Sequence, residues 1–285
     1  MKHIDPERST SAAVNRRGFV TLAAAAGLGA ASVTPARAKR AQQLGKVHAP
    51  LVAENDPHIV VERVVLKRPD GDVSAYAARP KKTTARTRGV VVVMHIWGVD
   101  TSIRDVVRRY AKAGYAAIAP DLFSRLNAPT GDGKTDFTIF RPYAAQLQPA
   151  QSDADIRAAA LWLRSAHPQG KIAVTGFCMG GAIALRQAIA SADLFVADAP
   201  FYGTPEGLDP AKVAVPVAGS YGERDTSIPT ADVFAFANAL HVPHDIKEYP
   251  TAGHAFFDDQ RTSYDSVAAP DAWRRTLTFF ETYLR

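Results

Sequence analysis

The stretch KIAVTGFCMGG, residues 171–181, decides the fold, because it predicts a buried strand, a sharp turn and the start of a helix in direct succession. Gly176 and Gly180 flank Cys178 and leave out the side chains that would collide in so tight a turn. A nucleophile on such an elbow faces the N-terminus of the following helix, which favours negative charge. The stretch therefore predicts an α/β sheet with chemistry at Cys178, although a buried structural cysteine is the simpler alternative.

Strand and helix patterns alternate on both sides of this elbow. Residues 58–66 and 73–80 predict a hairpin that turns at Asp70-Gly71. The run GVVVVMHI, residues 89–96, is typical of a central strand buried on both faces. Helical and strand patterns then alternate to the C-terminus. We expect a mainly parallel central sheet with helices on both faces, preceded by an antiparallel hairpin.

Two features inside this alternation are less regular. The helical pattern that ends near His167 is expected to begin at Ser152 and Asp153, which are suitable capping residues. The segment 126–150 is rich in glycine and proline and predicts an excursion near the carboxyl edge of the sheet, and whether it forms a lid stays open.

The N-terminal segment 1–38 has the order of an export signal. Arg16 and Arg17 precede a short alanine-rich run, and an A-x-A cleavage pattern lies at 36–38. The segment resembles a twin-arginine signal, which implies periplasmic or secreted localisation. An ordinary secretory signal or a surface helix is the alternative, and the run is too short for stable membrane insertion. We expect residues 39–57 to form a linker or arm and residues 58–285 to form one domain.

Composition limits the partners. The formal net charge is +6, and the segment 1–38 carries three of these charges. No run of five like charges occurs outside it, so we expect no nucleic-acid partner. Cys178 is the single cysteine, which excludes an internal disulfide and the multi-cysteine zinc patterns. The expected partner is a small molecule, anionic ones included, with no metal or cofactor, and the oligomeric state stays open.

Three complementary groups follow predicted strands. Cys178, Asp225 and His254 come after the strands of residues 171–176, 213–222 and 245–250, where open α/β sheets bind ligands. Their order of nucleophile, acid and histidine suits a triad in which the histidine is the general base. Glu223 and Asp198 are competing acids.

The mechanism also needs an oxyanion hole. Met179 N–H, at the start of the helix after the elbow, is the expected first donor. The second should come from the loop after residues 89–96, at Ile96 or Trp97. Candidates for the pocket wall are aromatic side chains near these strand ends, which are as often core residues: Trp97, Phe123, Phe177, Tyr202 and Phe256.

Five stretches, as an ordered set, resemble the dienelactone hydrolases (carboxymethylenebutenolidases) of the α/β-hydrolase superfamily. They are VVVMHIWGVDTSIRDVVRRYAKAGYAAIAPDLFSR, VTGFCMGG, GERD, AGHAFF and DAWRRTLTFF, and the likeness runs from about residue 59 to the C-terminus. The resemblance implies an α/β-hydrolase fold, a Cys178, Asp225, His254 triad and cleavage of a cyclic enol ester.

The sequence departs from the family pattern at two positions. His95 stands where family enzymes often have a glutamate that handles the thiol proton, and Asp258 stands where they often have a substrate-binding arginine. Arg125 is retained as the candidate for binding a substrate carboxylate, and Arg261 is a substitute only if its loop differs. His95 is either a tether of the oxyanion loop or a second imidazole that modulates the thiol.

The thiol narrows the substrate, because a thiolate leaves a tetrahedral intermediate more readily than an ordinary alkoxide. An enol ester or lactone releases a better leaving group, so we expect hydrolysis of lactones or activated esters through a thioester. A broader carboxylesterase or a peptidase-like hydrolase is the alternative within enzymes. A non-catalytic periplasmic binding or thiol redox-sensing protein is the alternative outside them.

Overall fold

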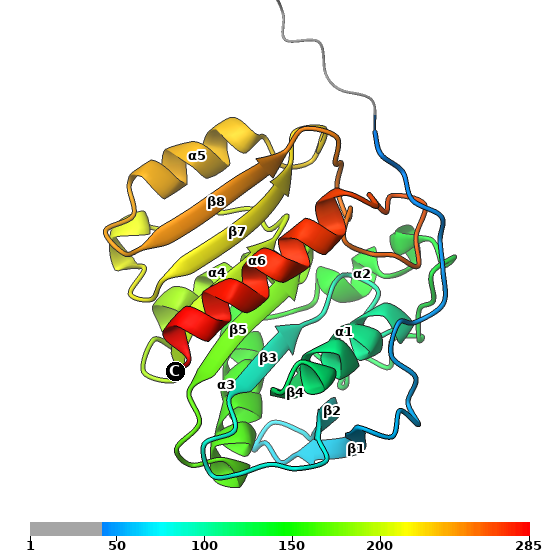
Figure 1. Cartoon of the computed structure of the whole chain (residues 1–285), viewed down its shortest axis with the longest axis vertical. Coiled ribbons are helices and arrows are strands. Elements are labelled where there is room, and N and C mark those ends of the chain that lie inside the picture. The colour runs from blue at the N-terminus through cyan, green and yellow to red at the C-terminus, as the bar shows by residue number, and fades with distance from the viewer. Residues whose placement is uncertain (1–41) are drawn as a thin grey trace, which may run out of the picture. The chain divides into compact units, whose positions relative to one another are not determined.

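The structure, a computed structural model, describes residues 42–285. The export signal expected at 1–38 lies outside the described residues. Eight strands of the described chain form one sheet in the order β1-β2-β4-β3-β5-β6-β7-β8 (Figure 1). The strands are β1 (Ile59–Leu66), β2 (Val73–Pro80), β3 (Gly89–Val93), β4 (Ala116–Pro120), β5 (Ile172–Phe177), β6 (Phe195–Phe201), β7 (Val217–Gly222) and β8 (His244–Tyr249).

Helices cover both faces of this sheet. They are α1 (Thr101–Lys112), α2 (Arg141–Ala144), α3 (Pro149–Ala166), α4 (Met179–Ala190), α5 (Thr230–Asn238) and α6 (Ala268–Tyr283). In Figure 1, α1 and α6 lie in front of the sheet, and α3 and α4 lie behind it. Every residue of β3 is buried, as a strand covered on both faces requires. The predicted mainly parallel α/β-hydrolase fold is therefore confirmed.

The predicted hairpin is also confirmed. Ile59 pairs with Pro80 and Leu66 with Val73 in an antiparallel register. Gly71 has a φ of +116°, a backbone conformation that glycine adopts without a steric cost. Because β2 also pairs antiparallel with β4, the hairpin extends the parallel part of the sheet at one edge.

The expected start of α3 is wrong by one turn. The helix begins at Pro149 with Gln148 as its N-cap residue, because proline at the first helical position has the right φ and needs no hydrogen-bond acceptor for its nitrogen. The Ser152 hydroxyl instead donates to the Gln148 carbonyl inside the first turn. Asp153 accepts from Arg186 and therefore joins α3 to α4.

The two irregular segments pack onto this frame. Residues 42–57 form an arm, and the N–H groups of Leu51 and Val52 donate to the Asp105 carboxylate at 2.9 and 2.8 Å. Within the segment 126–150 lie the short helix α2 and a 3-10 turn, and Phe140 is fully buried beneath them. The Thr135 carbonyl accepts from Trp97 Nε1 at 2.8 Å, so this segment is fastened to the loop after β3.

Candidate active site

Cys178 lies at the sharp turn between β5 and α4. Its φ of +57° and ψ of −119° are unusual for a residue with a side chain, and such strain is typical of functional sites. The turn is possible because neighbouring glycines allow a close approach of the backbone. A Cβ on Gly176 would lie 2.0 Å from the Gly180 carbonyl oxygen, and one on Gly180 would lie 2.4 Å from the carbonyl oxygen of Val93.

The structure brings His254 and Asp225 to the same edge as this turn. Asp225 follows β7 and His254 follows β8. His254 Nδ1 lies 2.6 Å from Asp225 Oδ2, and the Asp225 side chain is 1% exposed. The N–H groups of Ser227 and Ile228 donate to the other oxygen, Asp225 Oδ1, at 2.8 and 3.1 Å. These bonds fix the carboxylate, which in turn fixes the imidazole.

The competing acids do not take this position. His254 bonds Asp225 rather than Glu223, whose backbone N–H donates to the Tyr249 carbonyl. Asp198 is fully buried inside β6, and neither of its side-chain oxygens has a hydrogen-bond partner in the described chain. Burial raises the pKa of Asp198 well above its usual value, which favours an uncharged carboxyl there.

Opposite pKa shifts link the thiol and the imidazole. Burial raises the pKa of Cys178, but the hydrogen bond and charge of His254, with the Met179 N–H and the charge of His95, hold it below its usual value. Burial lowers the pKa of His254, but its bonds to Asp225 and Cys178 raise it to about 10. The site therefore favours a thiolate paired with an imidazolium.

Of the oxyanion donors predicted from the sequence, Met179 N–H lies beside this pair, and Ile96 and Trp97 stay predictions. Met179 N–H begins α4 and contributes to the stabilisation of the Cys178 thiolate. The loop after β3 turns tightly at residues 95–98, where the Gly98 N–H donates to the His95 carbonyl. Within residues 42–285, neither Ile96 N–H nor Trp97 N–H donates to another backbone or side-chain group. Both are therefore available as a second donor.

His95 lies in a buried cluster of charges. Its Nε2 is 3.0 Å from Asp100 Oδ1 and its Nδ1 is 3.8 Å from Asp258 Oδ2. Burial lowers the pKa of His95, but the attraction of Asp100 and Asp258 raises it above its usual value. Arg261 Nε donates to Asp258 at 2.9 Å and closes the cluster. The favoured imidazolium at His95 adds positive charge near the thiolate.

Arg261 has a structural position. Its guanidinium carbon lies 3.4 Å from the centre of the Trp97 ring, and Nη2 donates to the Asp132 carbonyl at 2.8 Å. The same group lies 3.3 Å from Asp100. Arg261 thus fastens the loop after β3 to the segment 126–150. Because its guanidinium is already bonded to these groups, the structure does not direct it toward a substrate carboxylate.

Arg125 is occupied as well. Its guanidinium donates to both oxygens of Asp155, at 2.7 and 2.9 Å, and to the backbone carbonyl of Asp70. Asp155 is 1% exposed and belongs to α3. This arrangement does not direct Arg125 toward an incoming substrate carboxylate, so its binding role stays a prediction.

The candidate wall residues divide into two groups. Trp97 and Phe123 line a cavity at the carboxyl edge. Phe177, Tyr202 and Phe256 are each 2% exposed or less and belong to the aromatic core. Among these three, the Tyr202 ring lies 5.2 Å from the His254 ring and supports the imidazole directly.

Sequence reasoning missed Asp100. Its position directly before α1 indicates an N-cap, and its Oδ1 does accept from the N–H groups of Ser102 and Ile103. The N-cap pattern does not predict the second contact of Asp100, with His95.

Groups of three or more His, Cys, Asp or Glu side chains that could hold a metal ion do not occur among the described residues. No helix in this range has the length and apolar character needed to cross a membrane.

Comparison with known proteins places this geometry in context. A sequence profile of the dienelactone hydrolase family matches residues 73–284. A protein of Salmonella typhimurium, provisionally named a carboxymethylenebutenolidase, is 36% identical over 226 residues, which cover 74% of this chain and 83% of the relative. A protein of Escherichia coli K12 with the same provisional name is 35% identical over 82% of this chain and 91% of its own.

Solved structures agree with these relatives. The crystal structure of a provisionally named dienelactone hydrolase from Klebsiella pneumoniae superposes with a TM-score of 0.72 at 33% identity and covers 79% of this chain and 99% of its own. A dienelactone hydrolase of Anabaena variabilis has a TM-score of 0.63 at 18% identity over 80% of this chain and all of its own, which shows a shared fold.

Proposed function

The chain belongs to the dienelactone hydrolase family of carboxylic ester hydrolases, and from that premise we propose that it hydrolyses lactones or activated enol esters through a thioester on Cys178. The observation that carries the proposal is the pairing of His254 Nδ1 with Asp225 Oδ2 at 2.6 Å beside a cysteine held at positive φ. A thiol that acts only as a redox sensor needs neither the acid nor the imidazole, so the triad supports catalysis over that alternative.

The proposed reaction starts from the thiolate–imidazolium pair. The Cys178 thiolate attacks the ester carbonyl carbon, and the carbonyl π electrons move to oxygen as the carbon–sulfur bond forms. Met179 N–H and an N–H of Ile96 or Trp97 stabilise that oxyanion. The carbonyl re-forms as the carbon–oxygen bond breaks, and the leaving enolate takes the proton of the His254 imidazolium, which becomes neutral.

Hydrolysis of the thioester completes the cycle. His254, now neutral, removes a proton from a water molecule, and the hydroxide attacks the thioester carbonyl. The thiolate leaves as the carbon–sulfur bond breaks, and the proton on His254 restores the ion pair. Because the thiolate leaves more readily than an alkoxide in the first intermediate, activated esters are the favoured substrates.

A broader carboxylesterase activity is the second candidate. The observation that favours it is that the candidate carboxylate-binding residue Arg125 is paired with Asp155, and its conditional substitute Arg261 with Asp258. With Asp258 itself a carboxylate, this geometry gives little support to selectivity for the small dicarboxylate-derived lactone of the family.

Turnover of p-nitrophenyl acetate and of cis- and trans-dienelactone by the wild type, Cys178→Ala and Cys178→Ser tests the proposal. We expect the alanine variant to lose activity. After brief exposure of the wild type to a chromogenic ester, we expect the intact mass of the protein to increase by one acyl group. The same slow background in all three proteins with every ester would refute the enzymatic function. Turnover of simple esters without the lactones would favour the second candidate.

We further propose that residues 1–38 direct export by the twin-arginine route, which the paired Arg16 and Arg17 support. Cell fractionation of the wild type and of Arg16→Lys/Arg17→Lys tests this. We expect the variant to remain in the cytoplasm, whereas continued delivery would indicate the general secretory route.

A further inference from the structure

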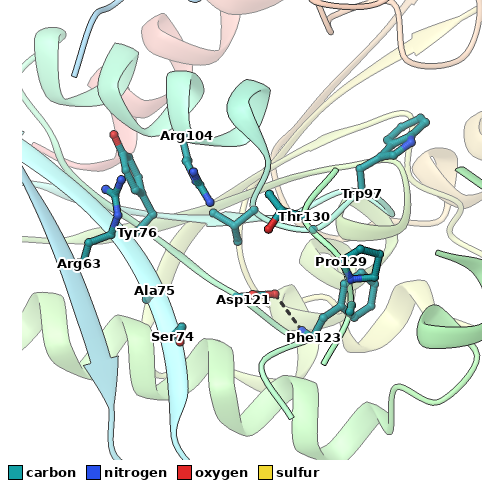
Figure 2. Close-up of a pocket in the computed structure, with 13 residues that line it drawn as sticks. Arg63, Ser74, Ala75, Tyr76, Trp97, Arg104, Asp121, Phe123, Pro129 and Thr130 are labelled. Carbon is teal, nitrogen blue, oxygen red and sulfur yellow. Dashed lines mark hydrogen bonds between the residues drawn. The ribbon is translucent and has the colours of Figure 1, made fainter. Parts of the chain in front are cut away.

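A small cavity opens at the carboxyl edge of the sheet, on the hairpin side of the proposed active site. It encloses about 120 Å³ and is lined by residues of β1 and β2, of the loops after β3 and β4, of α1 and of the segment 126–150. Figure 2 shows Arg104 extending from α1 into this space, between Tyr76 and Thr130. The reaction proposed above uses none of the groups that line it except Trp97.

The cavity carries more positive than negative charge. Its lining includes the guanidinium groups of Arg63 and Arg104 and one carboxyl, that of Asp121. Arg63 is paired with Glu54 at 3.2 Å, and both of these side chains are more than half exposed. The two guanidinium groups lie over the same ring, that of Tyr76, at 4.5 and 5.9 Å from its centre.

Arg104 differs from the other arginines of this edge. No carboxylate of residues 42–285 lies within 4.0 Å of its guanidinium, whereas Arg125 and Arg261 both have carboxylate partners. Arg104 also stands in the first turns of α1, where the helix dipole makes a cation unfavourable. A half-buried guanidinium in that position, with no ion pair of its own, would gain most from an external anion.

We propose that this cavity is a subsite for the carboxylate of an anionic substrate, with Arg104 as the residue that determines specificity. The inference rests on the proposed function and names its substrate class: an ester whose carboxylate stands well apart from the reacting carbonyl. The walls formed by Tyr76, Val99 and Phe123 suit the apolar carbons that precede the carboxylate.

The sheet order sets the length of that substrate. Cys178 follows β5, and the cavity lies over the ends of β4 and β2, two and three strands away in the order β2-β4-β3-β5. At about 4.8 Å between neighbouring strands, these strand ends are roughly 10–14 Å apart. Ser74 and Ala75 of β2 and Asp121 directly after β4 line the cavity, so it stays at those strand ends, whereas His254 reaches Cys178 through the loop after β8. The small lactone of the family is too short to span this distance, whereas the acyl chain of a long dicarboxylic acid monoester reaches it.

Asp121 shapes the other side of the cavity. Its Oδ1 accepts from the Phe123 N–H at 3.0 Å (Figure 2). Burial raises the pKa of Asp121, against the Phe123 bond and the charge of Arg104, which lower it.

Two measurements test the subsite. The first compares kcat/KM for the p-nitrophenyl monoesters of succinate, adipate and sebacate with the same esters capped by a methyl group. We expect the full-length protein to prefer the free carboxylate only in the long ester, and Arg104→Met to lower that preference about tenfold. Arg104→Lys should keep part of it, and Arg157→Met, which removes a surface partner of Asp193, should keep all of it.

The second measurement is the calorimetric affinity of full-length Cys178→Ala for sebacate, with and without Arg104→Met. We expect binding that weakens about tenfold when Arg104 is replaced, and that also weakens in Ala128→Leu, which fills the cavity. Ester turnover with a carboxylate preference that Arg104→Met leaves intact would overturn the subsite and leave the proposed function standing. Absence of sebacate binding would overturn the subsite too, whereas sebacate binding without any ester turnover would overturn only the proposed function.

Discussion

His95 Nδ1 lies 3.8 Å from Asp258 Oδ2, so the two positions that depart from the family pattern are in contact with each other. The resemblance gives these positions a glutamate and an arginine, and this chain has a histidine and an aspartate. Position 95 therefore changes from negative to positive and position 258 from positive to negative, so the two side chains still have opposite charges. The two departures therefore form one pair of opposite charges in this chain.

This exchange predicts a coupled effect on stability. His95→Glu alone would place a third buried carboxylate beside Asp100 and Asp258, and we expect it to cost about 3–5 kcal/mol. Adding Asp258→Arg restores an opposite pair and should recover about 1–3 kcal/mol beyond the sum of the single changes. Thermal unfolding of the two single variants and the double variant measures this coupling. Strictly additive changes would show that the two side chains do not act as a pair.

The His254–Asp225 contact predicts a large loss of activity in Asp225→Asn. The amide cannot hold the imidazolium or fix its tautomer, so kcat should fall by about 10³–10⁴ while the fold is kept. The matched control is Glu223→Gln, which neutralises the neighbouring carboxylate that does not bond His254. Steady-state kinetics on p-nitrophenyl acetate checks both. A larger loss in the Glu223 variant would assign the acid role to that residue.

The pKa shifts predict how the reactivity of Cys178 depends on pH. The lowered thiol pKa and the imidazolium pKa of about 10 define a range in which the ion pair dominates, so alkylation should slow only as pH falls through the lowered thiol pKa. In His254→Ala the burial remains without the cation, the thiol pKa rises, and alkylation at pH 7 should fall about tenfold or more. Iodoacetamide kinetics from pH 5 to 10 measure the profile. An unshifted profile would contradict the ion pair.

His95→Gln should slow the same alkylation by a smaller factor, about threefold near neutral pH, because His95 is a more distant positive charge. His167→Gln is the control, since His167 is also a buried histidine and its Nδ1 contacts the Thr84 carbonyl. An alkylation rate that does not change in His95→Gln would leave this residue only the role of tethering the oxyanion loop.

The sequence predicts the fold, and the edge of the sheet at which the candidate site lies, for one physical reason. Parallel strands end at one edge, so the loops after β5, β7 and β8, which carry Cys178, Asp225 and His254, share that edge. The order of strands does not predict contacts between side chains that are far apart in the sequence. Arg125 pairs with Asp155 on α3, and Arg261 pairs with Asp100. The spacing of these residues in the sequence predicts neither ion pair. The start of α3 differs from the predicted one because a proline at N1 outweighs a good capping residue one turn later.

The Arg125–Asp155 pair predicts that Arg125→Ala acts mainly on stability. Asp155 is 1% exposed, and loss of its two-fold bond to Arg125 leaves it only the 3.2 Å contact with Arg68 among residues 42–285. An incompletely paired buried carboxylate costs about 3 kcal/mol, which for a domain of this size lowers Tm by roughly 6–12 °C. The surface pair of Arg157 and Asp193 gives the matched control, and Arg157→Ala should change stability by less than about 1 kcal/mol.

Because Arg125 points at α3, the KM for an anionic ester should change no more in Arg125→Ala than the KM for its neutral counterpart. A selective rise in KM for the anionic ester, with Tm unchanged, would instead return Arg125 to the carboxylate-binding role that the family resemblance implies.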